Sequence, residues 1–400
     1  MFKEFFLLEI KSSLKRPMVY IFFLIIGLLS FGAIVFDNIQ IGGSVGNVMK
    51  NAPFVITQFV GVLSVIGVLF VVAFFNNASL KDYENQFNEI LFSTPISKAS
   101  FFFGRFFGAL VLATIPLLGV YLGVVLGSFL GPIIGSIGAE RIGPLFLETF
   151  VNNYLLFILP NMFFVGAIIF ALSTRFKSTV VSFVGALGLL IAYGISDTLL
   201  SEVDNETIAA LADSFGVTAW SVESRYFTPI EKNTLSPGFS GIFFLNRLIW
   251  IGVGMVVLML SYFSFSFREK QSKVKKKKSV NESLSLISKP QVTAIYSNWL
   301  QFKSFFTISF LNIIKSVVFK VIFLFALIIL TVEAVGGYEY YGLKSYPLTY
   351  IVIDMINDST TIFFIIIMVF FSGELIWNDR SSKINEVKCC YDCCWHICFF

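Results

Sequence analysis

The sequence predicts an all-α integral membrane protein, a polytopic helical bundle, and two observations carry that prediction. Hydrophobic residues make up 56% of the 400 residues and charged residues only 14%, while phenylalanine alone occurs 49 times. A soluble domain of this length needs a far more polar surface. The chain also contains repeated apolar runs of about 20 residues, which are long enough to cross the hydrocarbon core of a bilayer as helices.

Eight such runs predict eight membrane spans. The first run is too long for the core of a signal peptide, and no small-residue cleavage site follows it. We therefore expect it to be part of the mature protein. The spans are expected near residues 18–36, 54–75, 105–130, 150–172, 179–200, 243–266, 317–334 and 358–373.

Lysine and arginine in the connections predict the orientation of the spans. The stretch before the first span and the even-numbered connections are rich in lysine and arginine. The charged residues of the fifth connection, 201–242, are mostly aspartate and glutamate. Because basic connections stay on the cytoplasmic side, 201–242 is expected outside and the N-terminus inside. With eight spans, the C-terminus is expected inside as well.

The basic run Lys275–Lys278 lies in a predicted cytoplasmic linker, 268–296. Such a run is found in nucleic-acid-binding proteins, but it also forms solvated linkers that are attracted to anionic lipid headgroups. Membrane spans are predicted on both sides of this linker. We therefore expect membrane lipids, and no nucleic acid, as its partner.

The sequence after the linker repeats features of the beginning of the chain, which predicts an internal duplication. Phe2-Lys3-Glu4-Phe5-Phe6 recurs as Phe302-Lys303-Ser304-Phe305-Phe306, and each copy opens an amphipathic stretch that is expected to lie along the inner interface. Two spans later, a second landmark recurs in register: Asp82, Asn88 and Glu89, then Asp379, Asn385 and Glu386. The prediction is a first six-span unit at 1–267 and the first two spans of a second unit at 297–387.

The segment between the second and third spans has helical periodicity. Leu80, Tyr83 and Phe87 fall on one face, and Asp82 and Glu89 fall on another. This spacing predicts an amphipathic helix over 79–93, ended by Thr94-Pro95 because proline restricts the residue before it. Such a helix could transmit the movement of a soluble partner to the membrane spans, or it could be an interfacial helix with no coupling role.

The residues that follow add a resemblance. The pattern consists of Glu89, Leu91, Ser93, Thr94, Pro95, Ile96 and Ser97, followed by a phenylalanine-rich span with Gly104 and Arg105. It resembles the region after the second helix in ABC-2 type transporter permeases. In that family this inside segment is the coupling helix that docks on the ATPase subunit. By this resemblance the ATPase-coupling residues are Leu80, Asp82, Tyr83, Glu84, Phe87, Glu89, Thr94, Pro95, Asp379 and Glu386.

The layout is also similar to tandem permeases that some bacteria fuse to an M1-type aminopeptidase. No His-Glu-x-x-His and no phosphate-binding Gly-x-x-x-x-Gly-Lys-Ser/Thr is present in this sequence, so neither peptidase nor ATPase chemistry is expected in this chain. The resemblance implies a permease in the bacterial inner membrane, with no cofactor and no catalytic residue of its own. It is expected to be an exporter that works with a separate ATPase and with a second permease, either a copy of this chain or a paired subunit. The alternative is a membrane anchor or scaffold fragment whose transport is lost through truncation.

Polar residues within the spans have two interpretations, and a set of glycines has one. Gln58, Asn161, Asp197, Arg247 and Glu333 could line a route, but hydrogen bonding between helices or interface snorkelling is favoured. A glycine stripe late in the third span predicts close helix packing. Its members are Gly119, Gly123, Gly127, Gly131 and Gly135.

The last residues, 388–400, hold all five cysteines and the single histidine, His396. Their spacing could suit zinc or an iron cluster. The composition changes abruptly at Lys388, where the duplication predicts a continuation into further spans. An altered terminus is therefore favoured, and no metal site is expected.

Overall fold

The computed structural model divides into two compact units, Met1–Glu269 and Lys270–Phe400, which are described separately. The described residues are 1–36, 47–85, 87–134, 138–201, 206–267, 298–316, 319–320, 322–324, 326–327, 330–331, 338–340, 343–345 and 349–381.

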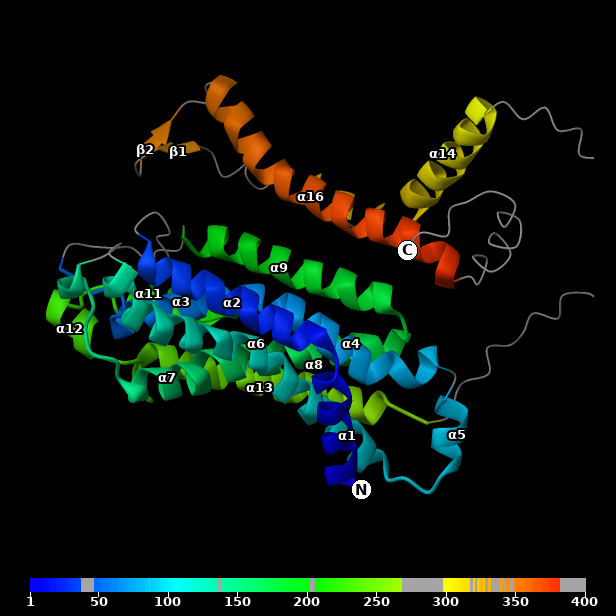
Figure 1. The fold of residues 1–400 in the computed structure, drawn as a ribbon, viewed down its shortest axis with the longest axis horizontal. Helices are drawn as coiled ribbons and strands as arrows, with labels where there is room; N and C mark the ends of the chain where they lie inside the picture. The colour runs from blue at the N-terminus through cyan, green and yellow to red at the C-terminus, as the bar shows by residue number, and fades with distance from the viewer. Residues whose placement is uncertain are drawn as a thin grey trace, which may run out of the picture. The chain divides into compact units, whose positions relative to one another are not determined.

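Unit 1 is helical throughout its described part (Figure 1). Its long helices are α1 (Phe2–Leu14), α2 (Pro17–Val35), α3 (Pro53–Ile66), α4 (Val68–Glu84), α6 (Lys98–Ile134), α8 (Leu159–Phe176), α9 (Thr179–Ser201) and α13 (Gly241–Ser264). Its short elements are α5 (Asn88–Ser93), the 3₁₀ turn η1 (Ala139–Arg141), α7 (Leu147–Asn153), the π-helical turn η2 (Tyr154–Ile158), α10 (Glu206–Ala212), α11 (Val217–Glu223) and α12 (Pro229–Thr234).

Unit 2 contains two long helices, α14 (Asn298–Lys315) and α16 (Thr349–Ser381), in its described part. A short antiparallel hairpin is formed by β1 (Tyr338–Tyr340) and β2 (Leu343–Ser345). The predicted helical class is therefore confirmed apart from this hairpin, which a prediction based on apolar runs did not include.

Four helical stretches among the described residues are long and apolar enough to cross a membrane: Pro17–Val35, Lys98–Ile134, Leu147–Phe176 and Gly241–Ser264. The pair α3 and α4, bent by 46° at its break, makes a fifth if it is one span. The predicted span 179–200 coincides with α9, whose apolar part is shorter, and 358–373 lies inside α16. Much of the predicted span 317–334 lies outside the described residues. The count of eight spans stays a prediction.

Glycines bring α2 and α6 into backbone contact. A Cβ atom on Gly123 would collide with the carbonyl oxygen of Gly27, and one on Gly119 would collide with that of Phe23. A Cβ on Gly127 would lie 2.8 Å from that of Ile34. Close packing of small residues is a principal attraction between helices in lipid. The predicted role of the glycine stripe is confirmed at these positions, while Gly135 lies outside the described residues.

The Gly123→Ala substitution should therefore destabilise unit 1 by about 1–3 kcal/mol, because the added methyl group forces α2 away from α6. The matched control is Gly252→Ala in α13, where a Cβ would meet nothing within 4 Å. Thermal unfolding of the detergent-solubilised protein measures both variants. Equal melting temperatures for the two would contradict the packing role of Gly123.

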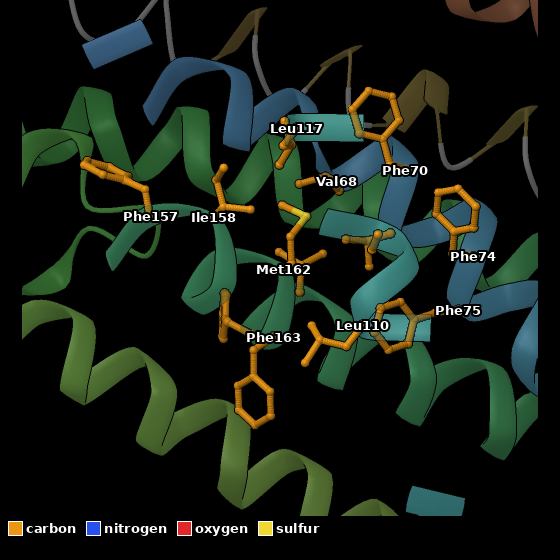
Figure 2. Close-up of a cluster of buried hydrophobic side chains, with 14 of the residues drawn as sticks. Val68, Phe70, Phe74, Phe75, Leu110, Leu117, Phe157, Ile158, Met162 and Phe163 are labelled. Carbon is orange, nitrogen blue, oxygen red and sulfur yellow. The ribbon is translucent and has the colours of Figure 1, made fainter. Parts of the chain in front are cut away.

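The core of unit 1 lies between α4, α6 and α8 (Figure 2). Phe75 of α4 is fully buried, and its ring lies where a side chain on Gly166 of α8 would be. At the break between α3 and α4, Gly67 leaves room for Met162, with a hypothetical Cβ only 2.7 Å from the Met162 methyl group. Large aromatic side chains thus fill the spaces that glycines leave.

The bundle of unit 1 has two ends that carry different short elements (Figure 1). At one end, α1 turns steeply away from α2, and α5 follows the end of α4. We call this the α1 end. At the other end lie α7, α11 and α12, and we call it the α12 end.

Candidate functional site

The predicted single amphipathic helix over 79–93 is wrong. α4 ends at Glu84, and α5 begins only at Asn88. Between them the Phe87 N–H donates to the Asp82 carbonyl oxygen at 2.8 Å. This bond joins residues five apart in the sequence, whereas an α-helical bond joins residues four apart. Bonds of this kind satisfy a free carbonyl group at the end of a helix and turn the chain. The segment is therefore two helices joined by a turn, and each presents different residues to the surface.

Two of the predicted residues near the end of α4 face into the bundle, whereas Glu84 at its last position is exposed. Leu80 is only 1% exposed and belongs to the core, and Asp82 is 7% exposed. The predicted apolar face is thus divided, since Leu80 is buried and Tyr83 is half-buried, while the side chains of this face beyond α4 are exposed. A partner cannot reach Leu80 in this structure.

Two further predicted residues connect α4 to the start of α9. The Lys177 ammonium group lies 4.3 Å from the ring centroid of Tyr83. The Thr179 hydroxyl donates to the Glu84 carboxylate at 3.1 Å. These contacts hold the end of α4 against the connection between α8 and α9.

The remaining predicted residues of this segment form an open patch together with Ile90, to which no coupling role was assigned. We call this patch the α5 surface: Phe87, Glu89, Ile90, Thr94 and Pro95. Phe87 is 47% exposed and Ile90 is 62% exposed, and the other three are also exposed. The helix ends at Ser93, directly before the predicted Thr94-Pro95 breaker. The α5 surface therefore combines two large apolar side chains with one carboxylate.

The opposite side of α5 is anchored by aromatic rings. Phe92 lies with its ring centroid 4.7 Å from that of Phe267, 5.6 Å from Phe101 and 6.0 Å from Tyr83. Phe101, at the start of α6, also contacts Phe5 of α1 at 5.4 Å. Offset and edge-to-face ring pairs of this kind add stability beyond the area that they bury. These rings join α1, α4, α5 and α6 at the α1 end.

A buried ion cluster lies next to one of these rings, with the Arg105 Cζ atom 5.4 Å from the ring centroid of Phe101. We call it the Arg105 triad: Arg105, Glu9 and Asp82. Arg105 Nη1 donates to Glu9 Oε2 at 3.0 Å, and Nη2 donates to Asp82 Oδ2 at 2.5 Å. Nη1 also lies 3.3 Å from the Ala78 carbonyl oxygen. Glu9 is completely buried and Arg105 is 2% exposed. One guanidinium thus holds carboxylates from α1 and α4 against α6.

A second layer of hydrogen bonds surrounds the Arg105 triad. The Asn77 side chain donates to the second Glu9 carboxylate oxygen at 3.3 Å and accepts from Arg16 at 2.8 Å. The Lys81 ammonium group donates to the Ser12 hydroxyl at 2.5 Å. Each of these bonds reaches from α4 to α1 or to the residues directly after it. The two helices are therefore linked on both sides of the ion cluster.

The sequence prediction assigned no role to Glu9. A signal was present, because Glu9 is a carboxylate within the apolar pattern of Phe2, Phe5 and Phe6, and such a residue usually has a buried cation as its partner. Arg105 appeared only within the family pattern. Their meeting depends on how α1 folds against α6, which helical periodicity does not specify.

The second unit offers little for comparison with this site. Asp379 lies in α16 near its end at Ser381, and its side chain is outside the described part of the structure. Glu386, the linker 268–296 and the tail 388–400 with its cysteines also lie outside the described residues. The predicted coupling role of the second unit stays a prediction.

A second polar cluster lies toward the α12 end. The buried Arg247 guanidinium donates to the Asn161 side chain at 2.7 Å and to that of Asn246 at 2.9 Å. Asn161 in turn donates to Ser64 at 2.7 Å, and Asn246 donates to the Asp213 carbonyl oxygen at 2.8 Å. The favoured interpretation of Asn161 and Arg247 as interhelical hydrogen-bonding residues is confirmed. This cluster fixes the segment before α11 to α13 and α8.

At the same end, a carboxylate caps the start of α13. The Phe243 N–H donates to Glu223 Oε2 at 2.9 Å. Burial raises the pKa of the Glu223 carboxyl, and hydrogen bonds from the backbone of Phe243 and Ile242 partly oppose that rise. A carboxylate at a helix N-terminus is also favoured by the helix dipole. Glu223 therefore has a structural role in holding the loop to the bundle.

The chain matches no protein-family model, and no curated protein is significantly similar to it. Within the described residues, no group of three His, Cys, Asp or Glu side chains is placed to hold a metal ion. The α5 surface and the Arg105 triad together make the candidate functional site, because one offers exposed apolar residues and the other connects them to the bundle.

Proposed function

We propose that this protein is the permease subunit of an ABC-2 type transporter in the bacterial inner membrane. The proposal makes it an exporter, driven by a separate ATPase that docks on the α5 surface. A second permease, either a copy of this chain or a paired subunit, would complete the route through the membrane.

The observation that carries this proposal is the α5 surface. Phe87 and Ile90 are large apolar side chains exposed at the end of a bundle, on a helix whose other side is anchored by Phe92. Exposed apolar residues on a rigid support are typical of interaction sites, because their burial by a partner releases water without a large ordering cost. Glu89 beside them favours a partner with basic groups around an apolar pocket.

Photo-crosslinking tests the proposal directly. Replacing Ile90 by p-benzoylphenylalanine in the native host should give a covalent adduct with a protein that carries an ATP-binding Gly-x-x-x-x-Gly-Lys-Ser/Thr sequence. The same replacement at Ile230, which is 76% exposed on α12, is the control and should give no such adduct. Adducts at position 90 with lipid alone would favour the membrane anchor or scaffold instead.

The proposal also fixes the orientation, with the α1 end inside the cell. Tyr226 is 84% exposed near α12 and should be reached from outside. In a variant whose five native cysteines are replaced by serine, a membrane-impermeant thiol reagent should label Tyr226→Cys in intact cells but not Lys275→Cys. Labelling of position 275 alone would reverse the orientation.

A further inference from the structure

The Arg105 triad is an unusual way to hold helices together in a chain with so few charged residues. Glu9 is 0%, Arg105 2% and Asp82 7% exposed, so all three charged groups are removed from water. Desolvation of buried ions costs about as much as their attraction returns, and apolar replacements of similar volume are often at least as stable. Stability alone therefore does not explain why charges occupy this position.

Hydrogen bonds between charged groups are directional, whereas apolar contacts are not. The two arms of the Arg105 guanidinium point to different helices, Nη1 to Glu9 on α1 and Nη2 to Asp82 on α4. Because the guanidinium is planar and rigid, the two carboxylates are held at a fixed separation and angle. A shift of either helix along its axis would break one of the two bonds.

We infer that Arg105 is a positioning residue that locks α1 and the end of α4 to α6, so that α1, α5 and the end of α4 move as one body. This inference rests on the proposed function for its consequence, which is that a push on the α5 surface reaches α1 and α6 together. The locking itself is a property of this chain and can be measured without the ATPase.

The backbone around Arg105 is built for this contact. A Cβ on Gly104 would lie 2.8 Å from that of Phe5, and a Cβ on Gly108 would lie 2.8 Å from that of Glu9. These glycines bring α1 directly onto α6 on either side of Arg105. At that separation the short reach from Nη1 to the Glu9 carboxylate is possible without stretching either side chain.

The aromatic rings at the α1 end are the competing explanation. Phe101 contacts both Phe5 of α1 and Phe92 of α5, so it could hold these helices without any charge. Ring pairs, however, remain favourable over centroid separations of about 4.5–7 Å, which is a wider range than the donor–acceptor distance of a hydrogen bond allows. If the rings alone set the position, removing the charges would leave the helices where they are.

A triple substitution, Glu9→Leu, Asp82→Leu and Arg105→Met, separates the two explanations. Spin labels at Lys3→Cys and Ile90→Cys, both exposed positions, report the distance between α1 and α5 by pulsed electron paramagnetic resonance in liposomes. The native cysteines are replaced by serine in every variant. We expect the distance distribution to broaden about twofold in the triple variant, because the directional bonds are gone, while the melting temperature is kept.

The matched control is Phe101→Leu, which removes a ring and keeps the charges, and its distribution should stay narrow. Arg105→Lys gives a second test if the triple variant does not fold, because lysine keeps the charge but loses the planar fork, and it should also broaden the distribution. Narrow distributions in the triple variant or in Arg105→Lys would overturn the inference. A broad distribution without an ATPase adduct at position 90 would contradict the proposed function alone.

Discussion

The Arg105→Met substitution is expected to destabilise the folded protein by about 3–5 kcal/mol, the typical cost of removing one partner from a buried ion pair. Glu9 and Asp82 would then remain buried with no guanidinium between them. The two carboxylates also repel each other, which adds to the cost. Denaturant unfolding of the purified protein, followed by tryptophan fluorescence, measures this loss.

Two comparisons make this expectation specific. The triple variant with Glu9→Leu and Asp82→Leu should recover most of the lost stability, because no uncompensated charge remains. Arg225→Gln removes an exposed ion pair with Glu206 at the α12 end and should cause no measurable loss. Equal instability of the single and triple variants would show that the side-chain volume of Arg105, and not its charge, is what the fold requires.

The membrane-length helices of unit 1 could be predicted from the sequence because their signal is local. An apolar run such as 18–36 has to be buried or embedded whatever it contacts, and α2 occupies nearly the same residues. The role of the glycine stripe could also be predicted, since glycine at Gly119 and Gly123 permits a close neighbour wherever that neighbour comes from. Neither prediction depends on knowing the partner helix.

The candidate site could be predicted only in part, because its geometry depends on distant contacts. The periodicity from Leu80 to Ile90 is continuous, so it gave no sign of the turn between Glu84 and Asn88. That turn buries Asn88 and directs Phe92 onto the rings of α6 and of the chain after α13. Tertiary packing of this kind overrides a local helical pattern.

The same limit applies to charge. Asp82 was predicted to share a helical face with Glu89, away from the apolar residues, as part of the coupling segment. Its actual partner, Arg105, is on another helix, and their contact also requires Glu9 to arrive from α1. A charged residue in a membrane-embedded bundle signals that a partner exists, but the sequence does not identify which one.

The last prediction concerns docking on the α5 surface. Ile90→Asp and Glu89→Lys should each weaken association with the ATPase by about 1–3 kcal/mol, which is about 5- to 150-fold in Kd. Ile90→Asp places a charge where an apolar contact is expected, and Glu89→Lys opposes basic groups on the partner. Both side chains are exposed, so the melting temperature of the permease alone should stay unchanged.

Co-purification of the ATPase identified by crosslinking measures this loss, with Ile230→Asp at the α12 end as the matched control. Leu80→Asp is unsuitable here, because Leu80 is buried and its replacement would unfold the core before it affected docking. Undiminished co-purification of Ile90→Asp together with Glu89→Lys would remove the docking role from the α5 surface. A loss confined to these variants, with Ile230→Asp unaffected, would place the ATPase at the α1 end, on the helix whose support includes the Arg105 triad.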